Sequence, residues 1–158
     1  MKRTISTLVV ASFATILSVN GASAQSMTNA TPAMSKEKSL YQRLGGYDAI
    51  AAVSDDFIGR LATEPAFVRF FPGLSSDSKM KLRQHVVDLL CFATGGPCIY
   101  TGRDMKTSHK GLGITGAEWD IAIKHLVETL DKFSVPTKER QDLFVILGPL
   151  KEQIVEKN

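Results

Sequence analysis

Cysteine and histidine are scarce in this sequence, which has two cysteines and three histidines among its 158 residues. Two cysteines form at most one disulfide, so the chain is unlike the small secreted proteins that several disulfides hold together. The six residues between Cys91 and Cys98 do not match the spacing of a two-cysteine zinc knuckle. The sequence leaves open whether Cys91 and Cys98 form a disulfide or remain two buried thiols.

Common catalytic and nucleotide-binding motifs are also missing. The sequence has no G-x-S-x-G nucleophile elbow, no H-E-x-x-H zinc motif, no phosphate-binding G-x-x-x-x-G-K and no dinucleotide fingerprint. Cys91 lies in an apolar stretch, where a thiol stays protonated and reacts poorly as a nucleophile. These catalytic schemes can therefore be set aside.

The longest apolar run, residues 8–17, is too short and too often interrupted by serine and threonine to span a membrane comfortably. It follows the basic start Met1–Arg3 and precedes Ala22–Ala24, which has the small residues of a cleavage site. This pattern predicts that residues 1–24 are a secretory signal peptide rather than a membrane anchor. We expect secretion across the inner membrane, into a bacterial periplasm.

The rest of the chain divides into a linker and one domain. Residues 25–38 are small, polar and aperiodic, which predicts a flexible linker before a domain at residues 39–158. Loss of the signal peptide removes Lys2 and Arg3 but no acidic residue, so the formal net charge falls from +3 to +1. Such a nearly neutral chain gives no electrostatic reason to expect nucleic acid or an anionic membrane as a partner.

Apolar residues recur at helical spacing, and no segment alternates with the period of a strand. Capping-box spacings at Ser39–Gln42 and Thr115–Glu118 predict two helix starts, and Ser75–Ser78 and Pro136 predict two more. Asp55-Asp56 is expected on a solvated helix face. The sequence thus predicts an all-α domain of about five helices joined by glycine-rich corners. The predicted buried stripes are Ile50, Val53, Phe57, Ile58 and Leu61; Leu82, Val86, Leu89, Leu90 and Ala93; Trp119, Ala122, Ile123, Leu126, Leu130 and Phe133; and Leu143, Ile146, Leu147, Leu150 and Ile154.

The three histidines are the candidates for binding a metal or cofactor. His85 lies beside an apolar stripe, which also suits an ordinary histidine at the edge of a core. His125 shares a helix face with charged residues, so we expect it to face solvent. His109 precedes the glycine-rich loop Lys110–Gly113, where one imidazole can reach a pocket and hold a flat cofactor by an axial metal bond.

Five ordered motifs carry a resemblance to a known family. They are Leu40–Gly46, Phe70–Phe71, Thr94–Pro97, Tyr100–Lys106 and His109–Thr115. In this order they resemble the truncated haemoglobins of group I, from about Leu40 to the C-terminus. The resemblance implies a truncated globin fold, a two-over-two helical sandwich that encloses haem b.

The resemblance also implies roles for single residues. His109 occupies the position of the proximal histidine, which binds the haem iron, and Phe71 matches the phenylalanine that packs against the porphyrin. The other residues that it implies as part of the haem pocket are Tyr100, Met105, Ile114 and Trp119.

The distal side departs from the family pattern. Family members commonly have a tyrosine where this chain has Ile58, and often a glutamine where it aligns Leu82 and Val86. A hydrogen bond to a polar bound ligand contributes about 1–3 kcal/mol, a factor of about five to 150 in affinity. Its absence argues against a very tight oxygen complex, and so against slow-release oxygen storage and efficient nitric-oxide dioxygenation.

His85 precedes Val86, at a position where some family members supply a sixth iron ligand or a contact to a haem propionate. Ligation by His85 and His109 together would suit electron transfer with a redox partner protein. A propionate contact, or an exposed polar role, is the other interpretation.

Three functions remain at this point. The first is an exported globin that binds oxygen, nitric oxide or carbon monoxide at iron held by His109, for transport or sensing. The second is bis-histidyl haem electron transfer or redox chemistry with His85 as sixth ligand. The third, a helical interaction domain without haem, is disfavoured because His109, Phe71 and Trp119 are all present.

Overall fold

The computed structural model describes residues 37–157. The predicted signal peptide (1–24) and all but the end of the predicted linker (25–38) lie outside the described residues. Within residues 37–157 the regular elements are helices, and the one isolated bridge joins Thr115 and Lys157. None of the helices described here has the length and hydropathy needed to cross a membrane.

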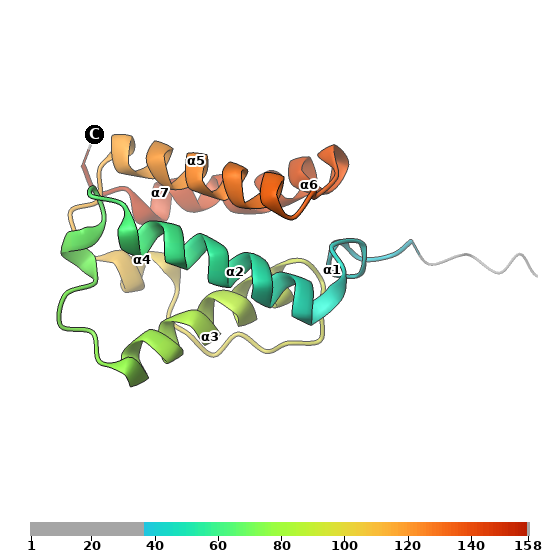
Figure 1. The fold of residues 1–158 in the computed structure, drawn as a ribbon, viewed down its shortest axis with the longest axis horizontal. Helices are drawn as coiled ribbons and strands as arrows, with labels where there is room; N and C mark the ends of the chain where they lie inside the picture. Colours follow the sequence, from blue (N-terminus) through green and yellow to red (C-terminus); the bar gives the residue numbers. More distant parts are fainter. Residues whose placement is uncertain (1–36, 158) are drawn as a thin grey trace, which may run out of the picture. The chain divides into compact units, whose positions relative to one another are not determined.

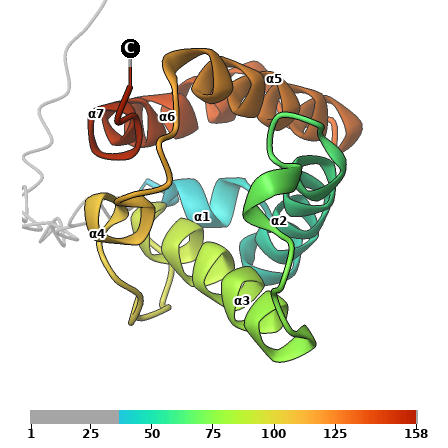
Figure 2. The same ribbon diagram turned by 90° about the vertical axis from the view of Figure 1, so that its left-hand side faces the viewer.

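The helices confirm the predicted all-α class. They are α1 (Leu40–Arg43), α2 (Gly46–Thr63), α3 (Ser76–Ala93), α4 (Met105–His109), α5 (Gly116–Lys132), α6 (Thr137–Leu147) and α7 (Lys151–Ile154), with short 3₁₀ helices at Val68–Phe70 and Gly148–Leu150. Figure 1 shows α2 and α3 as one layer and α5 with α6 as the other, and α2 packs against both α3 and α5. The short helix α4 contacts α7 at one end of this two-over-two arrangement (Figure 2).

Both predicted capping boxes are present. The Ser39 hydroxyl accepts a hydrogen bond from the Gln42 amide (3.3 Å), and the Gln42 side chain accepts one from the Ser39 amide (3.2 Å). Thr115 and Glu118 make the same reciprocal pair at the start of α5. Each pair satisfies amides that the first turn of a helix leaves without partners, so these starts are set locally.

Two clusters form the packed core. The first, Leu40, Leu126, Leu130 and Leu143, joins α1, α5 and α6, and the second is Ile50, Ala51, Val87 and Cys91 between α2 and α3. Leu82, Val86 and Leu89 of the predicted apolar stripe of α3 line a large cavity rather than packing on a neighbouring helix. The fully buried residues of α3 are Val87 and Cys91.

A disulfide joins Cys91, near the end of α3, to Cys98 in the following loop, with Cα atoms 5.7 Å apart. Gly96 lies between them in a tightly packed corner. A Cβ at Gly96 would come within 2.5 Å of the Tyr41 ring and 2.7 Å of the Cys91 carbonyl oxygen. Only glycine therefore fits the loop that the disulfide closes.

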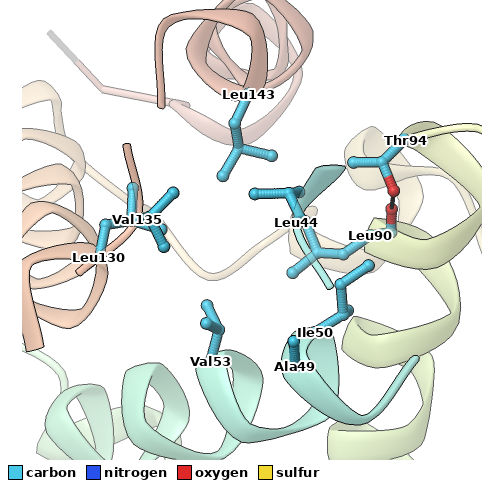
Figure 3. Close-up of a pocket in the computed structure, with 9 residues that line it drawn as sticks. All are labelled: Leu44, Ala49, Ile50, Val53, Leu90, Thr94, Leu130, Val135 and Leu143. Carbon is cyan, nitrogen blue, oxygen red and sulfur yellow. Dashed lines mark hydrogen bonds between the residues drawn. The ribbon is translucent and has the colours of Figure 1, made fainter. Parts of the chain in front are cut away.

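A small apolar cavity of about 30 Å³ lies where α1, α2, α3, α5 and α6 meet (Figure 3). Aliphatic side chains line it almost entirely, and its one hydroxyl, on Thr94, donates a hydrogen bond to the Leu90 carbonyl oxygen (2.7 Å). A buried water needs two or more polar partners, so this space suits no water molecule.

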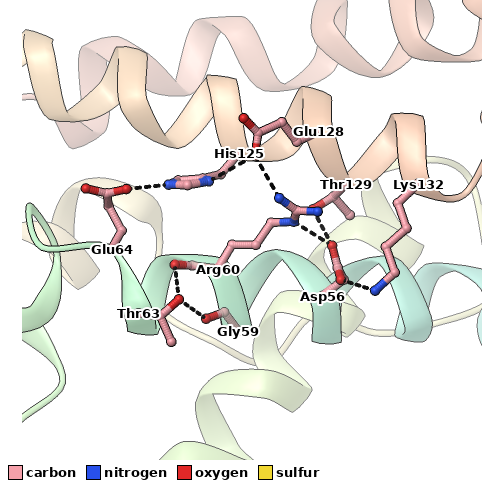
Figure 4. A network of polar contacts seen from close by, with 9 residues as sticks. All are labelled: Asp56, Gly59, Arg60, Thr63, Glu64, His125, Glu128, Thr129 and Lys132. Carbon is pink, nitrogen blue, oxygen red and sulfur yellow. Dashed lines mark hydrogen bonds and ion pairs between the residues drawn. The ribbon is translucent and has the colours of Figure 1, made fainter.

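The prediction that His125 faces solvent was wrong. Its side chain is 16% exposed, and its Nε2 lies 2.9 Å from a carboxylate oxygen of Glu64, while Glu128 lies on the other side of the ring (Figure 4). Glu64 follows the end of α2, and His125 is on α5. The contact therefore joins the end of α2 to α5 through two residues 61 positions apart in sequence, and helix periodicity alone does not indicate such a contact.

The prediction that Asp56 lies on a solvated face was also wrong, although Asp55 beside it is 53% exposed. Asp56 is 14% exposed and accepts hydrogen bonds from Arg60 (2.7 Å), Thr129 (2.9 Å) and Lys132 (Figure 4). These donors hold the pKa of the Asp56 carboxyl well below its usual range, with Arg60 the largest cause. Asp56 thus joins α2 to α5.

Candidate functional site

A cavity of about 780 Å³ lies among α2, α3, α4, α5 and α7. This volume falls in the range of about 300–1,000 Å³ that is typical of cofactor and small-molecule sites. The nine residues predicted to form a haem pocket all line this one cavity: His109, Phe71, Leu82, His85, Val86, Tyr100, Met105, Ile114 and Trp119. The structure brings them together; their individual contacts with haem remain predictions.

Other residues of the cavity wall were not predicted as site residues. Phe67, Leu74 and Leu112 had no distinguishing sequence signal. Ile123 and Ile154 were assigned to buried stripes, and that apolar periodicity was the available signal. Helical spacing predicts an apolar face but does not distinguish a face that packs on another helix from one that borders a cavity.

His109 is the last residue of α4, and its ring is partly buried in the cavity wall. Its Nδ1 lies 2.8 Å from the carbonyl oxygen of Met105. A carbonyl oxygen only accepts hydrogen bonds, so Nδ1 carries the proton and the Nε2 lone pair is free to bind a metal. A histidine that ligates a metal usually has its second nitrogen held in this way.

Ile58 of α2 and Leu82 and Val86 of α3 contribute aliphatic side chains to the cavity. None of the three has a hydrogen-bond donor in its side chain. These three side chains therefore offer no hydrogen bond to a ligand.

His85 is the second imidazole in the cavity wall. Its ring meets the ring of Tyr100 edge-on, with centroids 6.2 Å apart. The Tyr100 hydroxyl donates to the Arg103 carbonyl oxygen (2.6 Å), and burial raises the pKa of Tyr100. A Cβ at Gly102 would come within 2.4 Å of that hydroxyl, so the glycine leaves space for the ring. Tyr100 thus limits where the His85 ring can lie.

Charged groups lie at three further points of the wall. Lys81 and Arg103 bring positive charge, which complements carboxylates such as the propionates of haem b. Glu118 is nearly buried and paired with Arg69, which is the main cause that lowers the pKa of Glu118 to about 2. The wall thus combines a large apolar area, one oriented imidazole and cationic side chains, and these features fit haem.

The family model for bacterial-like globins matches residues 39–156. The chain belongs to the bacterial-like globins. Two similar proteins are group 1 truncated haemoglobins. The one from Mycolicibacterium paratuberculosis is 31% identical over 116 residues, which cover 73% of this chain and 83% of the relative. The one from Chlamydomonas moewusii is 30% identical over 132 residues, or 81% and 75% of the two chains.

Solved structures support the same assignment. The 2/2 haemoglobin of a Synechococcus species, in the cyanomet state with covalently attached haem, has a TM-score of 0.65 and 28% identity, and the match covers 73% of this chain and 95% of that one. The truncated haemoglobin of Tetrahymena pyriformis in its Fe(III) form, at 23% identity, shares the fold with a TM-score of 0.67 over 75% and 98% of the two chains. The protein is therefore a group 1 truncated haemoglobin with the two-on-two globin fold, and its cofactor is haem.

Proposed function

We propose that this globin is exported and binds a diatomic gas at haem iron held by His109. The observation that carries the proposal is the hydrogen bond between His109 Nδ1 and the Met105 carbonyl oxygen, which orients the imidazole and leaves Nε2 free. Haem iron supplies the position at which oxygen, nitric oxide or carbon monoxide coordinates. The protein supplies the axial imidazole and an apolar pocket that keeps water away.

The distal side chains favour ligands that need little help from hydrogen bonds. Bound oxygen is more polar than bound carbon monoxide, so a distal donor stabilises the oxygen complex more. Ile58, Leu82 and Val86 supply no such donor. We infer weak to moderate oxygen affinity, and a binding or sensing role for nitric oxide or carbon monoxide in preference to oxygen storage.

Export is supported by two independent features. The sequence of residues 1–24 has the basic, apolar and small-residue order of a secretory leader. The Cys91–Cys98 disulfide is of the kind that persists in an oxidising compartment such as a bacterial periplasm. Expression of the full chain in a bacterium should give a periplasmic protein that begins at Gln25. A full-length protein retained in the cytoplasm with two free thiols would contradict export.

Electron transfer remains the second candidate, because His85 and His109 line the same cavity. In this alternative both imidazoles bind iron, and His85 must leave before an external ligand can bind. The His85 ring meets the Tyr100 ring edge-on at the cavity wall, so ligation of iron by His85 would have to keep or break this contact.

Absorption spectra of residues 25–158, prepared with haem and recorded in both oxidation states, test these proposals. Gas binding predicts a Soret band and a five-coordinate ferrous spectrum that is unchanged in His85→Ala. A six-coordinate, low-spin ferrous spectrum that becomes five-coordinate in His85→Ala would support electron transfer instead. Absence of a Soret band from the wild-type protein would contradict both.

A further inference from the structure

The loop that follows His109 is held by the last residues of the chain. The Gly111 amide donates to one carboxylate oxygen of Glu156 (2.7 Å) and the Gly113 amide donates to the other (2.6 Å). Both glycines have positive φ, 84° and 62°. A left-handed conformation at these positions is open to glycine at little cost, and it lets amides two residues apart converge on one anion.

Main-chain contacts continue the same attachment. The amides of Glu156 and Lys157 both donate to the Ile114 carbonyl oxygen (2.8 and 3.2 Å), and the Gly116 amide donates to the Lys157 carbonyl oxygen (3.1 Å). A Cβ at Gly113 would lie only 3.2 Å from the Lys157 ammonium nitrogen. The segment 155–157 therefore lies closely along the glycine loop.

The carboxylate of Glu156 suits this position chemically. An ionised carboxylate accepts hydrogen bonds more strongly than a neutral oxygen, and each of its oxygens here receives one amide. The two amides, Gly111 first, hold the pKa of Glu156 below its usual range. Within the described residues, Glu156 is thus an anion placed on two main-chain donors beside the candidate iron ligand.

Helix α4 needs such support. It has five residues, and a helix this short does not persist without tertiary contacts. Asp104 caps its start by accepting from the Thr107 amide (2.7 Å). The last residue of α4 is His109, the proposed iron ligand, and the chain then turns at Gly111. The position of the His109 ring therefore depends on how firmly the next residues are held.

We propose that Glu156 is a positioning residue for the proximal histidine: its carboxylate fixes the Gly111–Gly113 loop and, through that loop, the direction of the His109 imidazole. This inference rests on the proposed role of His109 as the iron ligand. Glu156 itself touches neither iron nor gas.

Glu156→Gln tests the proposal, because the amide keeps nearly the same size but has one acceptor oxygen and no charge. In the ferrous protein, we expect the iron–histidine stretching band to shift and broaden, and hemin loss to accelerate about five- to tenfold. The control is Glu152→Gln, an exposed position on α7 that makes the same charge change. It should leave both readouts at wild-type values.

Hydrogen exchange of the Gly111 and Gly113 amides gives a readout that does not depend on haem. In the apoprotein both amides should exchange at least about tenfold faster in Glu156→Gln than in the wild type. Unchanged exchange together with an unchanged iron–histidine band would overturn the proposal. If Glu156→Gln retains no haem, the exchange measurement alone decides between support and rejection.

A second background separates positioning from general loosening. In His109→Gly with added imidazole, the axial ligand is no longer attached to α4, so Glu156→Gln should leave the iron–imidazole band unchanged. If Glu156→Gln shifts the band equally in the protein with His109 and in His109→Gly with imidazole, Glu156 does not act through His109. If His109→Gly without imidazole keeps the wild-type iron–histidine band, the assignment of His109 fails. If the band is lost in His109→Gly but Glu156→Gln, with His109 intact, keeps the wild-type band, only the role of Glu156 is rejected.

Discussion

The imidazole Nδ1 of His109 and the carbonyl oxygen of Met105 lie 2.8 Å apart, one turn apart on the helix α4. This contact sets which ring nitrogen carries the proton and aligns the ring with the helix that bears it. Met105 also lines the cavity. The main chain of one cavity residue thus orients the imidazole of another, the proposed iron ligand.

The distal side gives a first prediction. Ile58→Tyr places a hydroxyl on the cavity wall at one of the predicted distal positions. A hydrogen bond from it to bound oxygen should contribute about 1–2 kcal/mol and slow oxygen dissociation about five- to thirtyfold. Carbon monoxide dissociation should change much less. Stopped-flow measurements of both gases check this, with Ile58→Phe as the control for added bulk. Equal slowing by tyrosine and phenylalanine would contradict it.

The disulfide gives a second prediction. Cys98→Ala removes the closure of a loop of about eight residues, which should lower the free energy of unfolding by about 2–3 kcal/mol. Urea unfolding with and without a reducing agent measures the effect. Reduction should destabilise the wild-type protein and leave Cys98→Ala unchanged. A wild-type protein indifferent to the reducing agent would show that Cys91 and Cys98 are not joined.

Asp56 gives a third prediction. Asp56→Asn removes the charge that Arg60 and Lys132 share and weakens the acceptor of the buried Thr129 hydroxyl. We expect a loss of about 1–3 kcal/mol in the free energy of unfolding. Asp55→Asn is the matched control, since that pair with Arg83 is exposed and should contribute less than about 1 kcal/mol. Similar losses for the two variants would contradict the view that Asp56 joins α2 to α5.

The pH dependence of stability gives a fourth prediction. The pKa of Glu118 in the folded protein is about 2, below its ordinary value of 4.5. A lowered folded-state pKa means that the ionised group stabilises the fold above pH 4.5, and that this contribution disappears as the pH falls toward 2. The Tm of Glu118→Gln should therefore lie below that of the wild type at neutral pH, and the two should converge in acid. A Tm difference independent of pH would contradict the ion pair with Arg69.

The sequence predicts features that residues close together in the chain determine. The helix starts at Ser39 and Thr115 depend on a partner three residues away, and both were correct. His125 and Asp56 were assigned wrongly because Glu64 and Thr129, their partners, lie 61 and 73 residues away. No local rule brings such residues together.

The candidate site also has a part that the sequence predicted and a part that it did not. The ordered motifs around His109 carry the family resemblance that implied the pocket residues, and those residues all line one cavity. The attachment of Glu156 to Gly111 and Gly113 was not predicted. It joins positions 45 and 43 residues apart, and an isolated glutamate near a C-terminus carries no pattern that indicates its acceptor role.

The rate of hemin loss tests the central claim most directly. Hemin transfer to an excess of an apoglobin acceptor is timed for the wild type, His109→Ala and His85→Ala, with circular dichroism confirming equal helix content. If His109 holds the iron, His109→Ala should lose hemin at least about a hundredfold faster than the wild type, because an axial metal bond is removed. His85→Ala should stay within a few-fold of the wild type. Wild-type hemin retention in His109→Ala would contradict the account.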